Sequence, residues 1–169
     1  FRYLGVSNFD KKLLEQITDL TNIVSLQPHY SLLQRDIEEE ELPYCVENNI
    51  GNLSYGSIGG GILTGKYEEP PEFDDDDKRN QFYPFYDEDT WAQTLDLIEE
   101  MKEIADKHEV PIVQVAINWV RQQEGITTAL VGAKNPKQAK QNAAAANWNL
   151  SQEEIKLLTK ASNKVLSDK

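Results

Sequence analysis

The stretch NIGNLSYGSIGGGILTGKY, Asn49–Tyr67, joins a short run of apolar and small residues to a glycine-rich segment. The run Ile50–Tyr55 is typical of a buried β-strand. Directly after it come the residues of a candidate phosphate-binding loop: Gly56, Gly59, Gly60, Gly61, Thr64, Gly65 and Lys66. Glycine adopts positive φ at no steric cost, successive exposed N–H groups can bind a phosphate, and a lysine adds positive charge. A flexible turn beside a lysine would have the same composition, so the choice between a phosphate-binding loop and a simple turn depends on the rest of the chain.

Composition and charge exclude several classes of function. The chain has 169 residues, 39% of them hydrophobic and 27% charged, which is ordinary for one globular domain, 1–169. A net charge of −12 without a basic patch argues against nucleic acid and anionic membranes. No apolar run is long enough for a membrane helix, and no signal peptide is expected. The single cysteine, Cys45, excludes an internal disulfide and is interpreted as a small buried hydrophobe. We therefore expect a cytoplasmic protein.

Apolar runs and helical spacing alternate along the chain. They predict strands at Arg2–Ser7, Val24–Gln27, Asn52–Tyr55 and Thr128–Val131. Predicted helices begin at Asp10, span Glu38–Asn48, Thr90–His108 and Lys137–Ala146, and begin again at Pro111 and Ser151. Asp10 is a good N-cap, and Ser151 with Glu154 forms a capping box. The acidic run Glu38–Glu41 is interpreted as a solvated helix start.

Four strand–helix units predict an α/β fold with a parallel sheet and right-handed crossovers, which is half of a (β/α)8 barrel. In that fold, polar groups at the carboxyl ends of the strands carry function. The polar residues of this chain fall at those ends: Ser7, Asn8, Gln27, Tyr55 and Lys134.

The segment Glu68–Asp89 interrupts the alternation of strands and helices. It contains Pro70, Pro71, Pro84 and four successive aspartates, Asp74–Asp77, and predicts a long surface loop. The aspartates lack the glycine and closing glutamate of an EF-hand, so a calcium site is not expected. Tyr83 and Phe85 are candidates for one wall of a substrate pocket, or for aromatics that anchor the loop.

Several motifs together resemble the C-terminal half of the aldo-keto reductase family. They are GVSNF at Gly5–Phe9, QPHY at Gln27–Tyr30, LPYC at Leu42–Cys45, SYGSIGGGILTGKY at Ser54–Tyr67 and VGAKNPKQAKQN at Val131–Asn142. Each is weak alone, but they follow the family's order and spacing over nearly the whole chain. The resemblance implies barrel strands 5 to 8, an extra C-terminal helix and a piece of a longer chain, since the sequence begins Phe1-Arg2-Tyr3.

The resemblance implies that NADPH binds and that a carbonyl is reduced. Ser7, Asn8 and Gln27 would hydrogen-bond the nicotinamide carboxamide, and Tyr55 would stack on the ring. The implied phosphate and adenosine contacts are Ser57, Gly59, Gly61, Thr64 and Lys66 at the pyrophosphate, Lys134 at the 2′-phosphate, and Gln138 and Asn142 at the adenosine. Gln141 stands where the family usually has an acidic residue. Taken singly, Gln27, Tyr55 and Lys134 could instead be a strand-end amide, a core aromatic and a turn lysine.

The family's Asp–Tyr–Lys–His tetrad lies in the other half of its barrel, so we assign no catalytic residue here. His29 and His108 lack a Tyr–Lys partner at sensible spacing. The chain alone is expected to be inactive, and its open sheet edges require either the missing N-terminal half or a second copy. Two other hypotheses are a redox-sensing module that binds NADPH without turnover, as in channel β-subunit-like relatives, and a structural half barrel that self-assembles.

Overall fold

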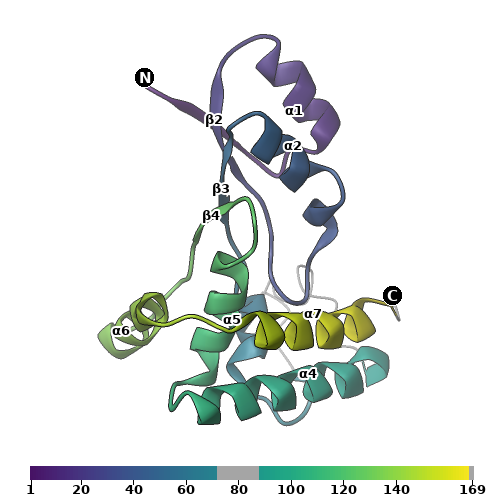
Figure 1. Ribbon diagram of the computed structural model, residues 1–169, viewed down its shortest axis with the longest axis vertical. Coiled ribbons are helices and arrows are strands. Elements are labelled where there is room, and N and C mark those ends of the chain that lie inside the picture. The colour runs from purple at the N-terminus through teal and green to yellow at the C-terminus, as the bar shows by residue number, and fades with distance from the viewer. Residues whose placement is uncertain (72–87, 168–169) are drawn as a thin grey trace.

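The computed structural model describes residues 1–71 and 88–167, with the side chains of 88 and 89 excepted. Strands and helices alternate in its first part, and helices dominate the second (Figure 1). The elements are β1 (Leu4–Ser7), α1 (Lys11–Thr18), β2 (Ile23–Gln27), η1 (Asp36–Glu38), α2 (Glu41–Glu47), β3 (Gly51–Ser54), η2 (Gly59–Thr64), α4 (Glu88–Lys107), α5 (Ile112–Arg121), β4 (Ile126–Ala129), α6 (Pro136–Ala144), η4 (Ala145–Asn147) and α7 (Gln152–Ser167).

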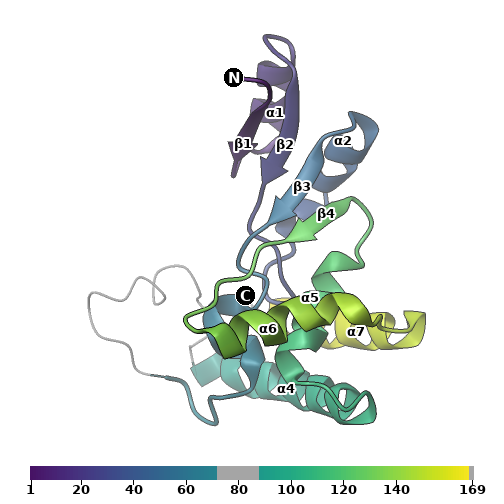
Figure 2. The ribbon, with the colours of Figure 1, turned by 90° about the vertical axis from the view of Figure 1, so that its left-hand side faces the viewer.

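The four strands form one parallel sheet in the order β1-β2-β3-β4. This confirms the predicted α/β class with a parallel sheet. Figure 2 shows the strands side by side, with their carboxyl ends directed toward the segments that lead into η2 and α6. In the described residues β1 pairs only with β2 and β4 only with β3, so both are edge strands.

Two apolar clusters hold the molecule together. The smaller joins the sheet to α1 and α2 through Leu14, Ile23, Leu26, Cys45 and Ile50. The larger packs α4, α5 and α7 around η2 and the segment after β2. Figures 1 and 2 both show α4 and α7 side by side at the end of the molecule away from α1. Trp119 and Tyr30 are fully buried in this cluster, with ring centroids 5.5 Å apart.

Helix capping follows the sequence predictions. The Asp10 carboxylate accepts a hydrogen bond from the Leu13 N–H, 2.8 Å away, and starts α1. At α7 the Ser151 N–H donates to the Glu154 carboxylate at 2.8 Å, and the Glu154 N–H donates to the Ser151 hydroxyl at 3.2 Å. Both predicted caps are confirmed, and they satisfy N–H groups that a helix start leaves without partners.

Two local predictions are wrong. The fourth strand is Ile126–Ala129 rather than Thr128–Val131, because Ile126 and Ala129 pack on the larger core while the residues after them turn toward a pocket. The second helix begins at Glu41 rather than at Glu38, although Glu39 and Glu40 before it are exposed, as a solvated helix start predicts. Glu38 instead binds the guanidinium of Arg35 at 2.9 and 2.7 Å and accepts a hydrogen bond from the Tyr30 hydroxyl.

The cluster of Tyr30, Arg35 and Glu38 delays the helix, so that a 3-10 turn comes first and α2 begins at Glu41. Burial raises the pKa of Glu38, but hydrogen bonds from Arg35 and Tyr30 outweigh it and leave the pKa below its usual value. Arg35 also donates to the side chain of Asn163 on α7 at 2.6 Å. The segment after β2 is therefore fastened to the C-terminal helix.

Most of the predicted Glu68–Asp89 loop, with Asp74–Asp77, Tyr83 and Phe85, lies outside the described residues. In the part of the chain that the structure covers, no helix is long and apolar enough to cross a membrane. Nor do His, Cys, Asp and Glu side chains gather there in groups of three that could hold a metal ion.

Candidate functional site

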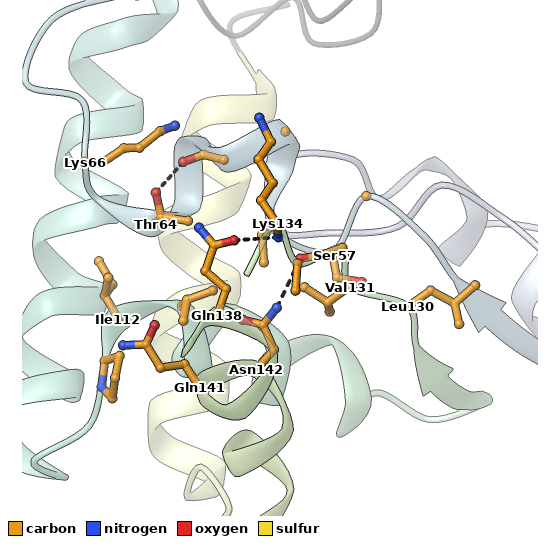
Figure 3. Close-up of a pocket in the computed structure, with 18 residues that line it drawn as sticks. Ser57, Thr64, Lys66, Ile112, Leu130, Val131, Lys134, Gln138, Gln141 and Asn142 are labelled. Carbon is orange, nitrogen blue, oxygen red and sulfur yellow. Dashed lines mark hydrogen bonds between the residues drawn. The ribbon is translucent and has the colours of Figure 1, made fainter. Parts of the chain in front are cut away.

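A pocket of about 730 Å³ lies at the carboxyl-end side of β3 and β4. The glycine loop after β3 forms one wall, and the β4–α6 loop with α6 forms another (Figure 3). The start of α5 completes it. The lining residues are Gly56, Ser57, Ile58, Gly60, Gly61, Thr64, Lys66, Pro111, Ile112, Val113, Leu130, Val131, Gly132, Ala133, Lys134, Gln138, Gln141 and Asn142.

The glycine loop folds on itself through its own backbone. Its hydrogen bonds run from the N–H groups of Gly59, Gly61, Leu63 and Gly65 to carbonyls of Gly56, Ile58 and Ile62. Gly61 has φ of +107°, a conformation that a residue with a side chain rarely adopts. These four N–H groups are already engaged, so they are not free to bind an anion.

The hydroxyl of Ser57 is the loop's unsatisfied polar group. Ser57 is 1% exposed and lines the pocket, and its Oγ has no hydrogen-bond partner in the described residues. Burying a hydroxyl without a partner costs about 1–3 kcal/mol, so such groups usually mark a site that a ligand or water completes. By contrast, the hydroxyl of Thr64 is engaged, since it donates to the Gly61 carbonyl at 2.6 Å.

Two lysines bring positive charge to the pocket from different walls. A Cβ added to Gly61 would stand 3.6 Å from Cε and 3.7 Å from Nζ of Lys66, so the lysine lies over the glycine loop. Lys134 reaches the pocket from the β4–α6 loop. Figure 3 shows both side chains on the same side of the pocket, above Gln138 in that view. In a protein of net charge −12, two lysines at one cavity favour an anionic ligand.

Side chains of α6 fasten the loop that carries Lys134. The backbone N–H of Lys134 donates to Gln138 Oε1 at 2.7 Å, and Asn142 Nδ2 donates to the Gly132 carbonyl at 3.2 Å (Figure 3). Asn135 caps the helix by accepting a hydrogen bond from the Gln138 N–H at 2.9 Å. Gln138 and Asn142 therefore line the pocket and shape the loop together.

A second group of predicted residues meets at the ends of β1, β2 and β3. The Ser7 hydroxyl donates to the Gln27 carbonyl at 2.9 Å, and the Tyr55 hydroxyl donates to Asn8 Oδ1 at 3.1 Å. The ring of Tyr55 stacks on His29, with centroids 5.0 Å apart. These four predicted nicotinamide contacts are adjacent to one another, but none of them lines the pocket.

Seven of the predicted site residues line the pocket, namely Ser57, Gly61, Thr64, Lys66, Lys134, Gln138 and Asn142. Gly59 does not. It is buried, and a Cβ on it would stand 2.9 Å from Leu33 Cδ1, so its role is close packing. Pro111, Ile112 and Val113 also line the pocket but were not predicted, because no motif marks the start of α5 and only tertiary packing brings it to the glycine loop.

The family model "Aldo/keto reductase family" matches residues 1–163. The chain belongs to the aldo/keto reductase family. Aldo-keto reductase YhdN of Bacillus subtilis is 31% identical over 168 residues, which cover 99% of this chain and 50% of that protein. The solved structure of the glycerol dehydrogenase AKR11B4 from Gluconobacter oxydans superposes with a TM-score of 0.84 at 30% identity, over 98% of this chain and 49% of that one.

The names of two relatives in the aldo/keto reductase family specify different cofactors. Aldo-keto reductase yakc [NADP(+)] of Schizosaccharomyces pombe is 27% identical over 95% of this chain and 48% of that protein. The NADH-specific methylglyoxal reductase of Escherichia coli is 26% identical over 93% of this chain and 47% of that protein. The chain thus spans about half the length of the curated relatives it matches.

Proposed function

We propose that this chain supplies the cofactor-binding part of an NADPH-dependent oxidoreductase that reduces aldehydes and ketones to alcohols. The observation that carries the proposal is the pocket in which the buried, unsatisfied Ser57 hydroxyl, Lys66 and Lys134 meet in an acidic protein. Family membership supports the same chemistry.

The pocket residues fit the phosphates and adenosine of such a cofactor. Ser57 can donate its hydroxyl hydrogen to a pyrophosphate oxygen, and Lys66 can neutralise the charge there. Lys134, which is exposed at the pocket, is suited to the 2′-phosphate that distinguishes NADPH from NADH. Ile112 and Val113 offer an apolar surface to a flat base, while α6 offers amide donors and acceptors.

The bound nicotinamide would supply a hydride to the carbonyl carbon of the substrate. We place the ring at the strand ends, where Asn8 and Gln27 present amides and Tyr55 presents an aromatic face already backed by His29. Amides can hold a carboxamide in one orientation without adding charge. We assign no proton donor to this chain, and we expect no turnover from the chain alone.

The proposal is tested by titrating the purified chain with NADPH and with NADH, following nicotinamide fluorescence. Lys134→Ala should weaken the binding of NADPH about tenfold, because it removes a charge-assisted contact to phosphate. The affinity for NADH should change little. Lys137→Ala is the matched control, since Lys137 is also an exposed lysine of this segment but does not line the pocket. Absence of NADPH binding by the folded wild type would refute the proposal and favour a purely structural half barrel.

Turnover is tested separately. The chain mixed with the first half of a related reductase should reduce an aldehyde if the barrel can be completed in trans. NADPH binding without turnover in a completed barrel that carries the tetrad would favour the redox-sensing alternative.

The proposal about a partner starts from the two edge strands of the sheet. A closed (β/α)8 barrel has eight parallel strands, whereas β1 and β4 each have one neighbour among the described residues. We propose that four further strands cover both edges, either from another sequence or from a second copy. A measured solution mass equal to one chain at micromolar concentration would exclude the second copy.

A further inference from the structure

Helix α6 carries one wall of the pocket without being held by apolar burial. Gln138, Gln141 and Asn142 all lie on it and face the pocket, yet none of its residues is buried. A helix of nine residues is too short to be stable by itself in water. Its position relative to the glycine loop must therefore depend on specific contacts to the rest of the molecule.

Gln114 of α5 provides such a contact. Its side-chain Nε2 donates to the backbone carbonyl of Gln141 at 3.0 Å, and in the described part of the chain this is the one hydrogen bond that joins α5 to α6. Gln114 is 4% exposed, and it follows directly after the pocket-lining residues Pro111–Val113. A single buried amide thus connects two walls of the pocket.

The other end of the same amide is also satisfied. Gln114 Oε1 accepts a hydrogen bond from Trp148 Nε1 at 2.9 Å. Trp148 is further held by Arg121, which donates to its carbonyl, and by the ring of His108, whose centroid is 4.6 Å from its own. Because both polar atoms of Gln114 have partners, the amide has one orientation, and the Gln141 carbonyl is held at one place.

We infer that Gln114 is a positioning residue for the adenosine side of the pocket: it holds α6 at the distance from α5 and the glycine loop that the ligand requires. The inference about binding rests on the proposed function, whereas the inference about α6 can be tested without any ligand. Removing Gln114 would leave a partly buried carbonyl and a partly buried indole N–H without partners, and α6 would shift until these groups find others.

The matched control is Gln122, at the C-terminal end of the same helix. It also bridges two polar groups, since its Nε2 donates to the Leu150 carbonyl at 3.0 Å and its Oε1 accepts from the Leu150 N–H at 2.8 Å. Gln122 makes no side-chain hydrogen bond to α6 among the described residues and does not line the pocket. Gln114→Met and Gln122→Met therefore each remove two side-chain hydrogen bonds, one pair in the first turn of α5 and the other at its C-cap. Gln114→Glu keeps an acceptor for Trp148 but lacks the donor to Gln141.

The first readout is hydrogen exchange of the ligand-free chain, measured on a peptide that covers α6. Gln114→Met and Gln114→Glu should accelerate exchange in α6 about tenfold relative to the wild type, which is the factor expected for the loss of one partly buried hydrogen bond. Gln122→Met should leave α6 unchanged. Unchanged exchange of α6 in both Gln114 variants, or equal acceleration by Gln122→Met, would overturn the inference.

The second readout is the affinity for adenosine 2′,5′-bisphosphate, measured by calorimetry. Gln114→Met should weaken it about tenfold and Gln122→Met less than about twofold. Equal affinities of the two variants would show that Gln114 does not position the ligand wall. If the wild type itself binds no adenosine bisphosphate, the proposed function fails, and the exchange experiment still decides whether Gln114 holds α6.

Discussion

Glu154 offers a sharp test of the packing between α4 and α7. Its side chain is 7% exposed, and its Oε1 accepts from Lys107 Nζ at 2.7 Å and lies 2.9 Å from His108 Nε2. Its Oε2 closes the capping box with the Ser151 N–H. Burial alone would raise the pKa of Glu154, but the hydrogen bonds from Lys107, Ser151 and His108 outweigh burial and lower the pKa from 4.5 to about 2.

The variant to make is Glu154→Gln, because glutamine can retain the capping box while it removes the charge. A shift of one pKa unit corresponds to about 1.4 kcal/mol. Lowering the pKa of Glu154 from 4.5 to about 2 therefore corresponds to about 3 kcal/mol of stability at neutral pH. The value is an upper limit, because Lys107 is 67% exposed and water screens its charge. We expect Glu154→Gln to lower the free energy of unfolding by about 1–2 kcal/mol at pH 7.

The pH dependence gives the sign of the effect. A lowered pKa means that the folded state holds the proton less tightly than the unfolded chain does. The stabilisation is therefore complete above the unfolded value of 4.5 and is lost as the pH falls toward about 2. Between these values it changes by up to about 1.4 kcal/mol per pH unit. The difference between wild type and Glu154→Gln should shrink over this range.

The assay is urea unfolding followed by tryptophan fluorescence at several pH values. Glu99→Gln is the control, since Glu99 pairs with Lys102 but its carboxylate is 65% exposed, and its loss should cost less than about 0.5 kcal/mol. Equal effects of Glu154→Gln and Glu99→Gln at pH 7 would contradict the role given to Glu154. So would a stability deficit of Glu154→Gln that does not diminish as the pH is lowered.

Three further predictions concern single residues. Ser57→Ala should raise the free energy of unfolding by about 1 kcal/mol, because it removes a buried unsatisfied hydroxyl. It should also weaken NADPH binding in the fluorescence titration. A loss of stability would show that the hydroxyl has a partner. Gly59→Ala should lower stability by about 1 kcal/mol or more, since its φ is +55° and its Cβ would crowd Leu33, and thermal unfolding would measure this. Burial raises the pKa of Cys45 to about 11, so a disulfide reagent at pH 8 should label it only when the chain unfolds, and rapid labelling of the native protein would contradict its burial.

The glycine loop and the strand ends were predictable because their signals are local. A run such as Asn52–Tyr55, followed by glycines and a lysine, predicts a strand and a turn from propensity alone. The caps at Asp10 and Ser151 are equally local, since each side chain bonds to a backbone group three residues away. Adjacent parallel strands then bring Ser7, Gln27 and Tyr55 together at one edge of the sheet.

The failures arise where distant partners compete with local preference. Glu38 belongs to a run of four acidic residues that predicts a helix start, yet it lies before α2. Its carboxylate is partly buried and binds Arg35 and Tyr30 instead. The fourth strand begins at Ile126, two residues earlier than predicted. Ile126 and Ala129 pack against the larger core, and they belong to a longer run of apolar and β-branched residues in which several registers are equally plausible. Neither choice can be read from a window of neighbouring residues.

Local periodicity and recognisable motifs predicted the class of the fold, the order of the four strands, the caps at Asp10 and Ser151, and seven residues that line the pocket. Three features could not be predicted from neighbouring residues: Pro111–Val113 complete the pocket, Ser57 has a buried unsatisfied hydroxyl, and Gln114 donates to Gln141 of α6. Each of them depends on residues that are far apart along the chain. Gln114 and Gln141 are 27 residues apart, and only the packed fold brings such groups within hydrogen-bonding range.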